Sequence, residues 1–265
     1  MSFFFTDGTG APCMLVSMVE ILHSEIPADL DPDASLPGIK PLSDGQWLRR
    51  DEAYAAQMAY RRKLIERRRD KVIWASDDAS DAIEEVFREA ALLFPAMGFA
   101  MTTRHLFCPD GAEIDLEADD MLVSLGCAVQ EDICILQKTG DEHVLTAAVL
   151  CFPASWTLAE KVGRPLTRIH TPVPEYDDRV ATRVQRLFDG VQVGKPLWRN
   201  NYLFYDSADL HQPMSETDPA RQVPPPDDAG YLRAERQCIF RLPQTRAVVF
   251  SIHTYVARRT SAQLA

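Results

Sequence analysis

The segment QEDICILQKTGDEHVLTAAVLCFP, residues 130–153, carries the clearest structural signal in the chain. Residues 133–136 and 144–152 form two apolar runs, and the turn residues Lys-Thr-Gly-Asp at 138–141 separate them. Two such runs joined by a short polar turn that contains glycine predict a β-hairpin. The segments on either side of this hairpin decide what kind of domain it belongs to.

Three further strands are predicted downstream, in WRNNYLFYD (198–206), YLRAERQCIFRLP (231–243) and RAVVFSIHTYV (246–256). A short helix at 155–162, a proline-rich segment and an amphipathic helix at 176–191 connect the hairpin to them. Separate runs of strands and helices indicate an α+β fold. A PAS-type domain has the same order of elements: two strands, a helical connection and three more strands. That fold holds a ligand between a five-stranded antiparallel sheet and the connecting helices.

The N-terminal part of the chain has a different character. Residues 1–48 contain scattered prolines and predict an extended arm, whereas helical spacing at 50–75 and 77–94 predicts two helices. We therefore divide the chain into an arm (1–48), a helical region that packs on the body (49–100) and a PAS-like domain (101–265). We expect the three parts to form one cooperative unit.

The composition limits the partners. A formal net charge of −11 argues against a general nucleic-acid or anionic-membrane surface, because like charge repels phosphate. The apolar run at 14–22 is too short to span a bilayer, contains Glu20 and lacks a preceding basic region. We expect a cytoplasmic protein with no nucleic-acid or membrane partner, in which all six cysteines stay reduced.

Polar residues inside the predicted strands are the first candidates for a site. Alternation along 231–243 places Arg236 on one face with Ala234 and Cys238, and Glu235 on the other. A cation on an apolar face needs an anionic partner or a ligand to offset its desolvation. Arg199 in the preceding strand poses the same question. Buried ion pairs would satisfy both arginines as well as a ligand would.

The segment between the short and the long helix carries a single histidine, His170. Prolines at 153, 165, 172 and 174 fix the backbone around it, so a long helix or a central strand is excluded there. A histidine in such a stiff segment has the properties of a pre-organised ligand. From this segment alone, a purely structural histidine is the favoured interpretation.

Taken together, the motifs resemble a known family. They are PGIKPL (37–42), WLRRDEAYAAQMAYRRKLI (47–65), VQEDICIL (129–136), LCFPASWTLAEKVGRPLTRIHTPVP (150–174) and the three downstream strands. In this order they resemble the haem-dependent oxidative N-demethylase family, whose best-known activity is that of the haem subunit of dimethylamine monooxygenase. The likeness covers nearly the whole chain from residue 37 onward.

The resemblance implies a PAS-like fold that binds haem b. It also implies a monooxygenase activity in which O2 removes a methyl group from a small methylated amine, such as dimethylamine, and releases formaldehyde. The sequence shows no nucleotide or iron–sulfur motif, so electrons would come from an external NAD(P)H-dependent flavin/iron–sulfur reductase. The basic residues between 61 and 69 would offer a docking face for it.

The same resemblance implies roles for particular residues. His170 would be the axial ligand of the haem iron, and Arg199 would hydrogen-bond O2 at that iron. Glu235 would bind the substrate ammonium or deliver a proton, and Lys161 or Arg236 would pair with the haem propionates. Alternation puts Glu235 and Arg236 on opposite faces, so a β-bulge would be needed to bring both into one pocket.

Two residues depart from the family pattern and leave an alternative open. Tyr202 stands where the family usually has tryptophan, and His253 stands where it usually has arginine. If either residue lines the pocket, the substrate would differ and activity itself would be in question. The alternative is a non-catalytic sensor of PAS type that binds haem and gas, or another small ligand, without turnover.

Overall fold

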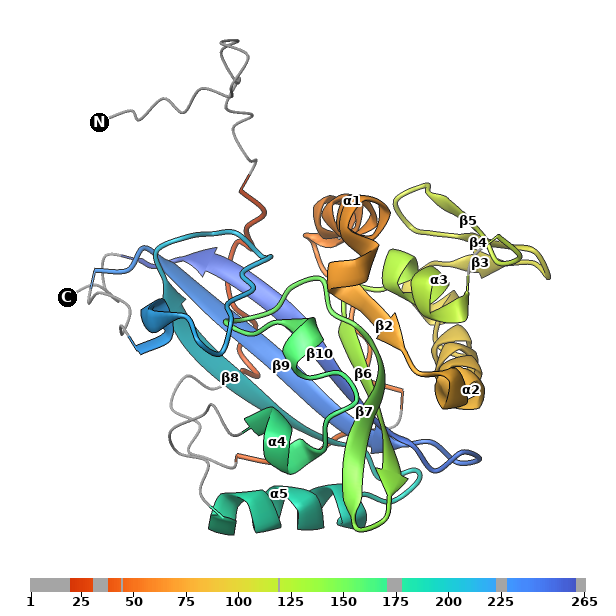
Figure 1. The fold of residues 1–265 in the computed structure, drawn as a ribbon. Coiled ribbons are helices and arrows are strands. Elements are labelled where there is room, and N and C mark those ends of the chain that lie inside the picture. The colour runs from red at the N-terminus through yellow and green to blue at the C-terminus, as the bar shows by residue number, and fades with distance from the viewer. Residues whose placement is uncertain are drawn as a thin grey trace, which may run out of the picture.

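The centre of the protein is a seven-stranded antiparallel sheet with the order β1-β8-β9-β10-β6-β7-β2 (Figure 1). The structure is a computed structural model that describes residues 20–30, 38–43, 45–118, 120–170, 178–222 and 228–260. In chain order the strands of this sheet are β1 (Lys40–Pro41), β2 (Ile73–Ala75), β6 (Asp132–Thr139), β7 (Glu142–Val149), β8 (Leu197–Tyr205), β9 (Tyr231–Arg241) and β10 (Val248–Arg258). The α+β class predicted from the sequence is confirmed.

The predicted hairpin is β6 and β7, and its turn closes at Gly140. The φ of this residue is +61°, a conformation that glycine adopts without the steric cost of a side chain. The three predicted downstream strands are β8, β9 and β10, which pair in that order as antiparallel neighbours. The segments with the strongest periodicity in the sequence therefore form the middle strands of the sheet.

The expectation of five strands is wrong for this sheet, because one short strand is added at each edge. Lys40 of β1 pairs with Trp198 of β8, and Ile73 of β2 pairs with Val149 of β7. These edge strands are only two and three residues long. Strands so short carry no alternation of their own, so the sequence pattern could not reveal them.

Helices cover both faces of the sheet. One face, here called the α1 face, packs against α1 (Tyr54–Val72), α2 (Ser80–Ala91) and α3 (Met121–Ala128) and against Trp47 and Leu48. The opposite face, here called the α4 face, packs against the 3-10 turn η3 (Leu158–Glu160), α4 (Leu166–His170) and α5 (Asp178–Gly190) (Figure 1). Residues before α1 thus share a core with the strands, while the division into three regions stays a prediction.

A second, small sheet lies beside α2 and α3. Its strands are β3 (Ala100–Met101), β4 (His105–Phe107) and β5 (Glu113–Asp115), paired in that order. The remaining single turns are η1 (Asp77–Ala79), η2 (Pro95–Met97) and η4 (Pro219–Gln222). Among the described residues, no helix has both the length and the apolar character needed to cross a membrane.

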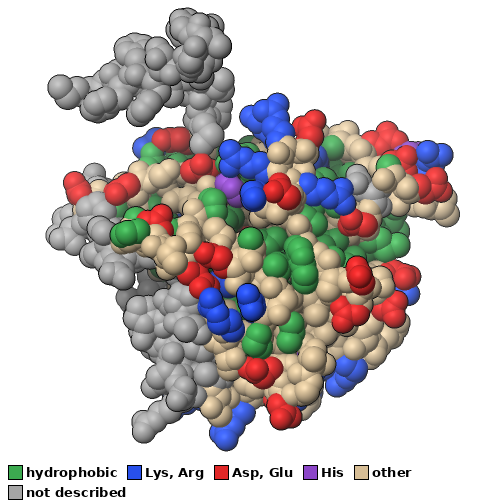
Figure 2. Space-filling view, viewed as in Figure 1, with side chains coloured by type: hydrophobic (Ala, Val, Ile, Leu, Met, Phe, Trp, Pro, Cys, Tyr) green, Lys and Arg blue, Asp and Glu red, His purple; other side chains and the backbone are tan. Residues whose placement is uncertain are grey.

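Two predictions about helices need correction. The short helix expected at 155–162 is only the turn η3, because Ser155 has a φ of +60° and its N–H bonds Gln212 instead of starting a helix. The expected basic docking face on α1 loses one of its residues, and docking by the others stays a prediction. Arg61 is fully buried against Asp132, and Figure 2 shows basic and acidic side chains interspersed where α1 lies.

Candidate functional site

The α4 face carries a row of polar side chains across its central strands. Glu235 of β9 pairs with Thr254 of β10, and Arg199 of β8 pairs with Gln237 of β9. Directly paired residues of antiparallel strands point to the same face. Neither strand pair shows a register shift here, so the predicted alternation holds and no bulge turns Arg236 towards Glu235.

Glu235 is held in place by two neighbours on its own strand. Arg233 Nε donates to Glu235 Oε1 at 3.2 Å, and Gln237 Nε2 donates to Glu235 Oε2 at 3.1 Å. Glu235 is only 5% exposed and Arg233 only 1%. Each carboxylate oxygen has a further lone pair for another donor. The carboxylate is therefore fixed in orientation and still able to accept from a ligand.

Arg233 is itself anchored by a chain of buried polar contacts that reaches α1. Its Nη1 donates to Leu210 O at 3.0 Å and its Nη2 to Phe152 O at 2.5 Å. The N–H of Phe152 donates to Asp132 Oδ2 at 2.8 Å, and Asp132 Oδ1 pairs with Arg61 Nη1 at 2.6 Å. The position of Glu235 thus depends on contacts that begin at a helix on the other side of the sheet.

Arg199 has no such anchor. Its Nε is buried and has no hydrogen-bond partner among the described residues. Burial lowers the pKa of Arg199, and the charge of Glu235 opposes this effect only in part. A desolvated cation without a partner costs free energy unless a ligand supplies one. Arg199 is therefore the residue of this face that most clearly needs a partner beyond the described residues.

His170 and Lys161 lie in the segment that covers this face. His170 ends α4, which packs on the sheet through Leu166 and Ile169. The side chain of His170 lies outside the described residues, so its prediction as a ligand is not tested. Lys161 Nζ donates to Ile169 O at 2.5 Å and to Glu216 Oε1 at 2.7 Å. Lys161 thus fixes the backbone immediately before His170.

Arg236 is not brought together with the other predicted site residues. It lies on the α1 face, where Nη1 contacts Cys238 Sγ at 3.1 Å and the guanidinium stands 5.3 Å from the Trp198 ring centre. Its charge also helps to lower the pKa of Asp29, after the hydrogen bond and charge of Arg49. Strict alternation along β9 separates it from Glu235, as the sequence indicated.

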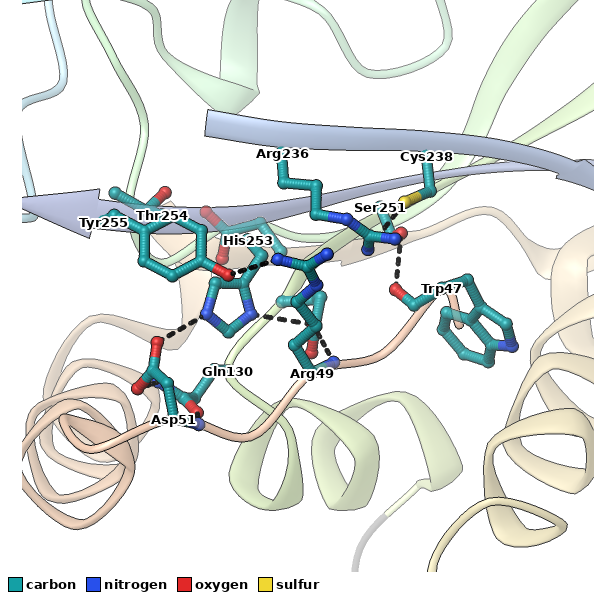
Figure 3. Close-up of polar contacts among 12 residues, drawn as sticks. Trp47, Arg49, Asp51, Gln130, Arg236, Cys238, Ser251, His253, Thr254 and Tyr255 are labelled. Atoms are coloured by element: carbon teal, nitrogen blue, oxygen red, sulfur yellow. Dashed lines mark hydrogen bonds and ion pairs between the residues drawn. The ribbon is translucent and has the colours of Figure 1, made fainter. Parts of the chain in front are cut away.

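A second polar cluster surrounds His253 on the α1 face (Figure 3). The imidazole donates to Glu131 Oε1 at 2.8 Å and to Asp51 Oδ2 at 2.9 Å. Burial alone would lower the pKa of His253, but the two carboxylates outweigh it and raise the pKa to about 9. Burial alone would raise the pKa of Asp51. Hydrogen bonds from His23 and His253 outweigh this effect and hold the pKa of Asp51 well below its usual range.

Both departures from the family pattern lie on this same α1 face. Tyr202 donates its hydroxyl hydrogen bond to Leu30 O at 2.9 Å, in a cluster with Ala234 and Tyr255. His253 is protonated at neutral pH and so supplies the positive charge that arginine would bring. Neither residue shares a face with Arg199. The described structure thus separates these two changes from the α4-face row.

The sequence missed Arg233, Gln237 and Thr254 as members of the site. Alternation had placed Arg233 and Gln237 on the face of Glu235, but nothing in the pattern showed that they would hold its carboxylate. Thr254 is paired with Glu235 through the register of β9 and β10. That register depends on how the two strands are joined and packed, which a single strand pattern does not contain.

The fold is that of an α+β protein, and its candidate site lies on one face of the antiparallel sheet, beneath the helical connection. Residues 38–263 match the model of the family described as haem-dependent oxidative N-demethylase, alpha subunit-like, and the chain belongs to this family. The resemblance read from the motifs is thereby confirmed. The family description names a haem-dependent activity, and its words "alpha subunit-like" suggest a multi-subunit enzyme.

A haem needs few ligands from the protein. Within the described ranges no group of three or more histidine, cysteine or acidic side chains is placed to hold a metal ion. A haem iron is held by the porphyrin and needs only axial ligands from the chain, of which histidine is the commonest in oxygen-binding proteins. The unpartnered Arg199 Nε and the partly apolar α4 face fit a group of this kind.

Proposed function

We propose that this chain is the haem-binding subunit of an oxidative N-demethylase that acts on a small methylated amine such as dimethylamine. The observation that carries the proposal is Arg199, whose buried Nε has no hydrogen-bond partner among the described residues and which lies on the same sheet face as Glu235, in a chain that belongs to a haem-dependent family. A guanidinium N–H without a partner among the described residues suits an oxygen reactant, and a carboxylate with free lone pairs suits an ammonium substrate.

The topology supports a PAS-like site for haem b. The strands β6 and β7 come first, then η3, α4 and α5, and then β8, β9 and β10. In such a domain the ligand lies between the sheet and the connecting helices, which here means the α4 face. His170 ends α4 in that connection, and in this proposal its imidazole would hold the haem iron.

Each of the other residues has a defined task in this proposal. Arg199 donates hydrogen bonds to the oxygen reactant, and Glu235 binds the substrate ammonium. Arg233 keeps the carboxylate of Glu235 in place. Lys161 fixes α4 through Ile169 O and is the candidate partner of a propionate. Arg236 is no longer assigned to the haem, because it lies on the other face.

The balanced overall reaction shows which reactants and how many electrons the proposed enzyme requires. When bound, haem provides the chemistry that activates O2. Dimethylamine, O2, two electrons and two protons give methylamine, formaldehyde and water, with one oxygen atom in the aldehyde and one in water. The electrons come from outside the chain, and we propose an NAD(P)H-dependent flavin/iron–sulfur reductase as the donor. A partner subunit agrees with the alpha-subunit description of the family.

Haem reconstitution of the purified protein tests this proposal. The wild type should show a Soret band and release formaldehyde from dimethylamine when reductant and O2 are supplied. His170→Ala should lose the spectrum of histidine-ligated haem. His211→Ala is the matched control, because His211 lies in the loop after β8 and its Nδ1 already contacts Cys151 O at 2.8 Å.

The outcomes separate the alternatives. A wild-type protein without a Soret band would refute the haem proposal. Loss of the ligand spectrum in His211→Ala but not in His170→Ala would move the axial ligand to His211. A normal haem spectrum without formaldehyde from any methylamine would favour the non-catalytic sensor.

A further inference from the structure

Thr254 is a residue of the α4 face that the proposed roles leave unused. Its hydroxyl oxygen is buried and has no hydrogen-bond partner among the described residues, and the whole residue is 1% exposed. Figure 3 shows its side chain on the side of β10 away from His253. In the sheet register Thr254 lies directly opposite Glu235. An unpartnered hydroxyl therefore lies beside a fixed carboxylate.

The fold does not explain this hydroxyl. The backbone of Thr254 is well used, since its carbonyl oxygen accepts from Gln57 Nε2 at 3.1 Å. A buried hydroxyl without a partner destabilises the fold, and valine would fill nearly the same space on a strand without this cost. A ligand that donates to Oγ1 would remove the penalty.

We propose that the Thr254 hydroxyl binds the substrate ammonium together with Glu235, an inference that rests on the proposed function. A dialkylammonium ion has two N–H groups. One donates to the Glu235 carboxylate, whose two oxygens each keep a lone pair beyond their bonds to Arg233 and Gln237. The other N–H donates to Thr254 Oγ1. Thr254 is therefore a substrate-binding residue that recognises the number of N–H groups on the amine.

This role predicts a difference between two probes. Dimethylammonium has two N–H donors and uses both acceptors. Trimethylammonium has one, which the charged carboxylate takes because hydrogen bonds to ionised acceptors are the stronger ones. Removal of the hydroxyl should then weaken the binding of dimethylammonium and leave that of trimethylammonium nearly unchanged.

The experiment compares the wild type, Thr254→Val and Thr254→Ser, each as ferric haem-loaded protein without reductant. Calorimetric titration with dimethylammonium chloride should give binding about tenfold or more weaker for Thr254→Val, the loss expected for a hydrogen bond from a charged donor. Trimethylammonium chloride should bind Thr254→Val within about twofold of the wild type. Thr254→Ser keeps the hydroxyl and should bind both ions as the wild type does.

A thermal unfolding measurement on the amine-free proteins completes the test. Thr254→Val should unfold at the same temperature as the wild type or higher, because an unsatisfied group has been removed. A clearly lower temperature would show that the hydroxyl has a partner within the protein and would overturn the inference. Equal weakening of both ammonium ions, or of neither, would also overturn it.

The failure of this inference differs visibly from that of the proposed function. A wild type with a normal Soret band that does not bind dimethylammonium removes the role of Thr254 and leaves a haem protein. A wild type without any Soret band removes the proposed function and this inference with it.

Discussion

Two polar clusters lie on opposite faces of the central strands, and their charges differ. The cluster on the α1 face contains three cations and three carboxylates, namely Arg49, Arg236, His253, Asp29, Asp51 and Glu131. The row on the α4 face contains two cations, Arg199 and Arg233, and one carboxylate, Glu235. Glu235 and Arg236 are neighbours on one strand, yet they belong to different clusters, one on each face of the sheet.

The difference indicates which cluster stabilises the fold and which one binds a ligand. Buried charges cost less free energy when each has an opposite charge within reach. On the α1 face His253 meets this condition with Asp51 and Glu131 and connects the segment before α1 to β10 (Figure 3), whereas Arg236 Nε has no hydrogen-bond partner among the described residues. The α4-face row does not meet it, because its one carboxylate, Glu235, is held by Arg233, and Arg199 Nε has no hydrogen-bond partner among the described residues. Charge balance therefore separates a structural cluster from a candidate site.

The largest effect is expected at His253. His253→Ala leaves Glu131 buried without its cation, and removal of one partner of a buried ion pair costs about 3–5 kcal/mol. Chemical denaturation should show this loss of unfolding free energy at pH 7. His253→Arg is the matched control, since arginine restores a cation between Glu131 and Asp51, and it should keep most of the stability. A loss below about 1 kcal/mol in the alanine variant would show that the cluster is not the structural one.

The sequence predicted the middle of this arrangement better than its edges. Apolar periodicity gave β6, β7, β8, β9 and β10 and correctly separated Glu235 from Arg236. It did not give the partner of His253, because Glu131 and Asp51 come from the segments before β6 and α1 and approach only through tertiary packing. A histidine on a strand looks the same in the sequence whether it is neutral or held between two carboxylates.

The same cluster should make stability depend on pH. The folded-state pKa of His253 is about 9, above its unfolded value of 6.5, so its contribution is complete below pH 6.5 and is lost as the pH rises towards 9. The difference corresponds to about 3 kcal/mol. Asp51 acts in the opposite direction: its lowered pKa stabilises the fold above its unfolded value of 3.8, and this contribution is lost as the pH falls below it.

Unfolding free energies measured from pH 6 to about 9.5 test this expectation. The wild type should lose stability over this range, and His253→Arg should lose less because arginine does not titrate there. Parallel curves for the two proteins would mean that His253 is neutral in the folded state, and the charge balance of the α1 face would then fail.

The smallest stability effect is expected at Arg199, and it gives the sharpest test of the comparison. Arg199→Met removes a partly desolvated cation whose Nε has no hydrogen-bond partner among the described residues, so the unfolding free energy should stay unchanged or rise by up to about 1 kcal/mol. Arg236→Met is the matched control on the neighbouring strand. It removes the contact with the Trp198 ring and unbalances the charges of the α1 face, at a cost of about 1–2 kcal/mol.

In turnover the order of the two variants should reverse, with Arg199→Met inactive and Arg236→Met active, because only Arg199 shares a face with Glu235. If both variants lose the same stability and the same activity, charge balance does not distinguish the two faces, and the site must be sought elsewhere.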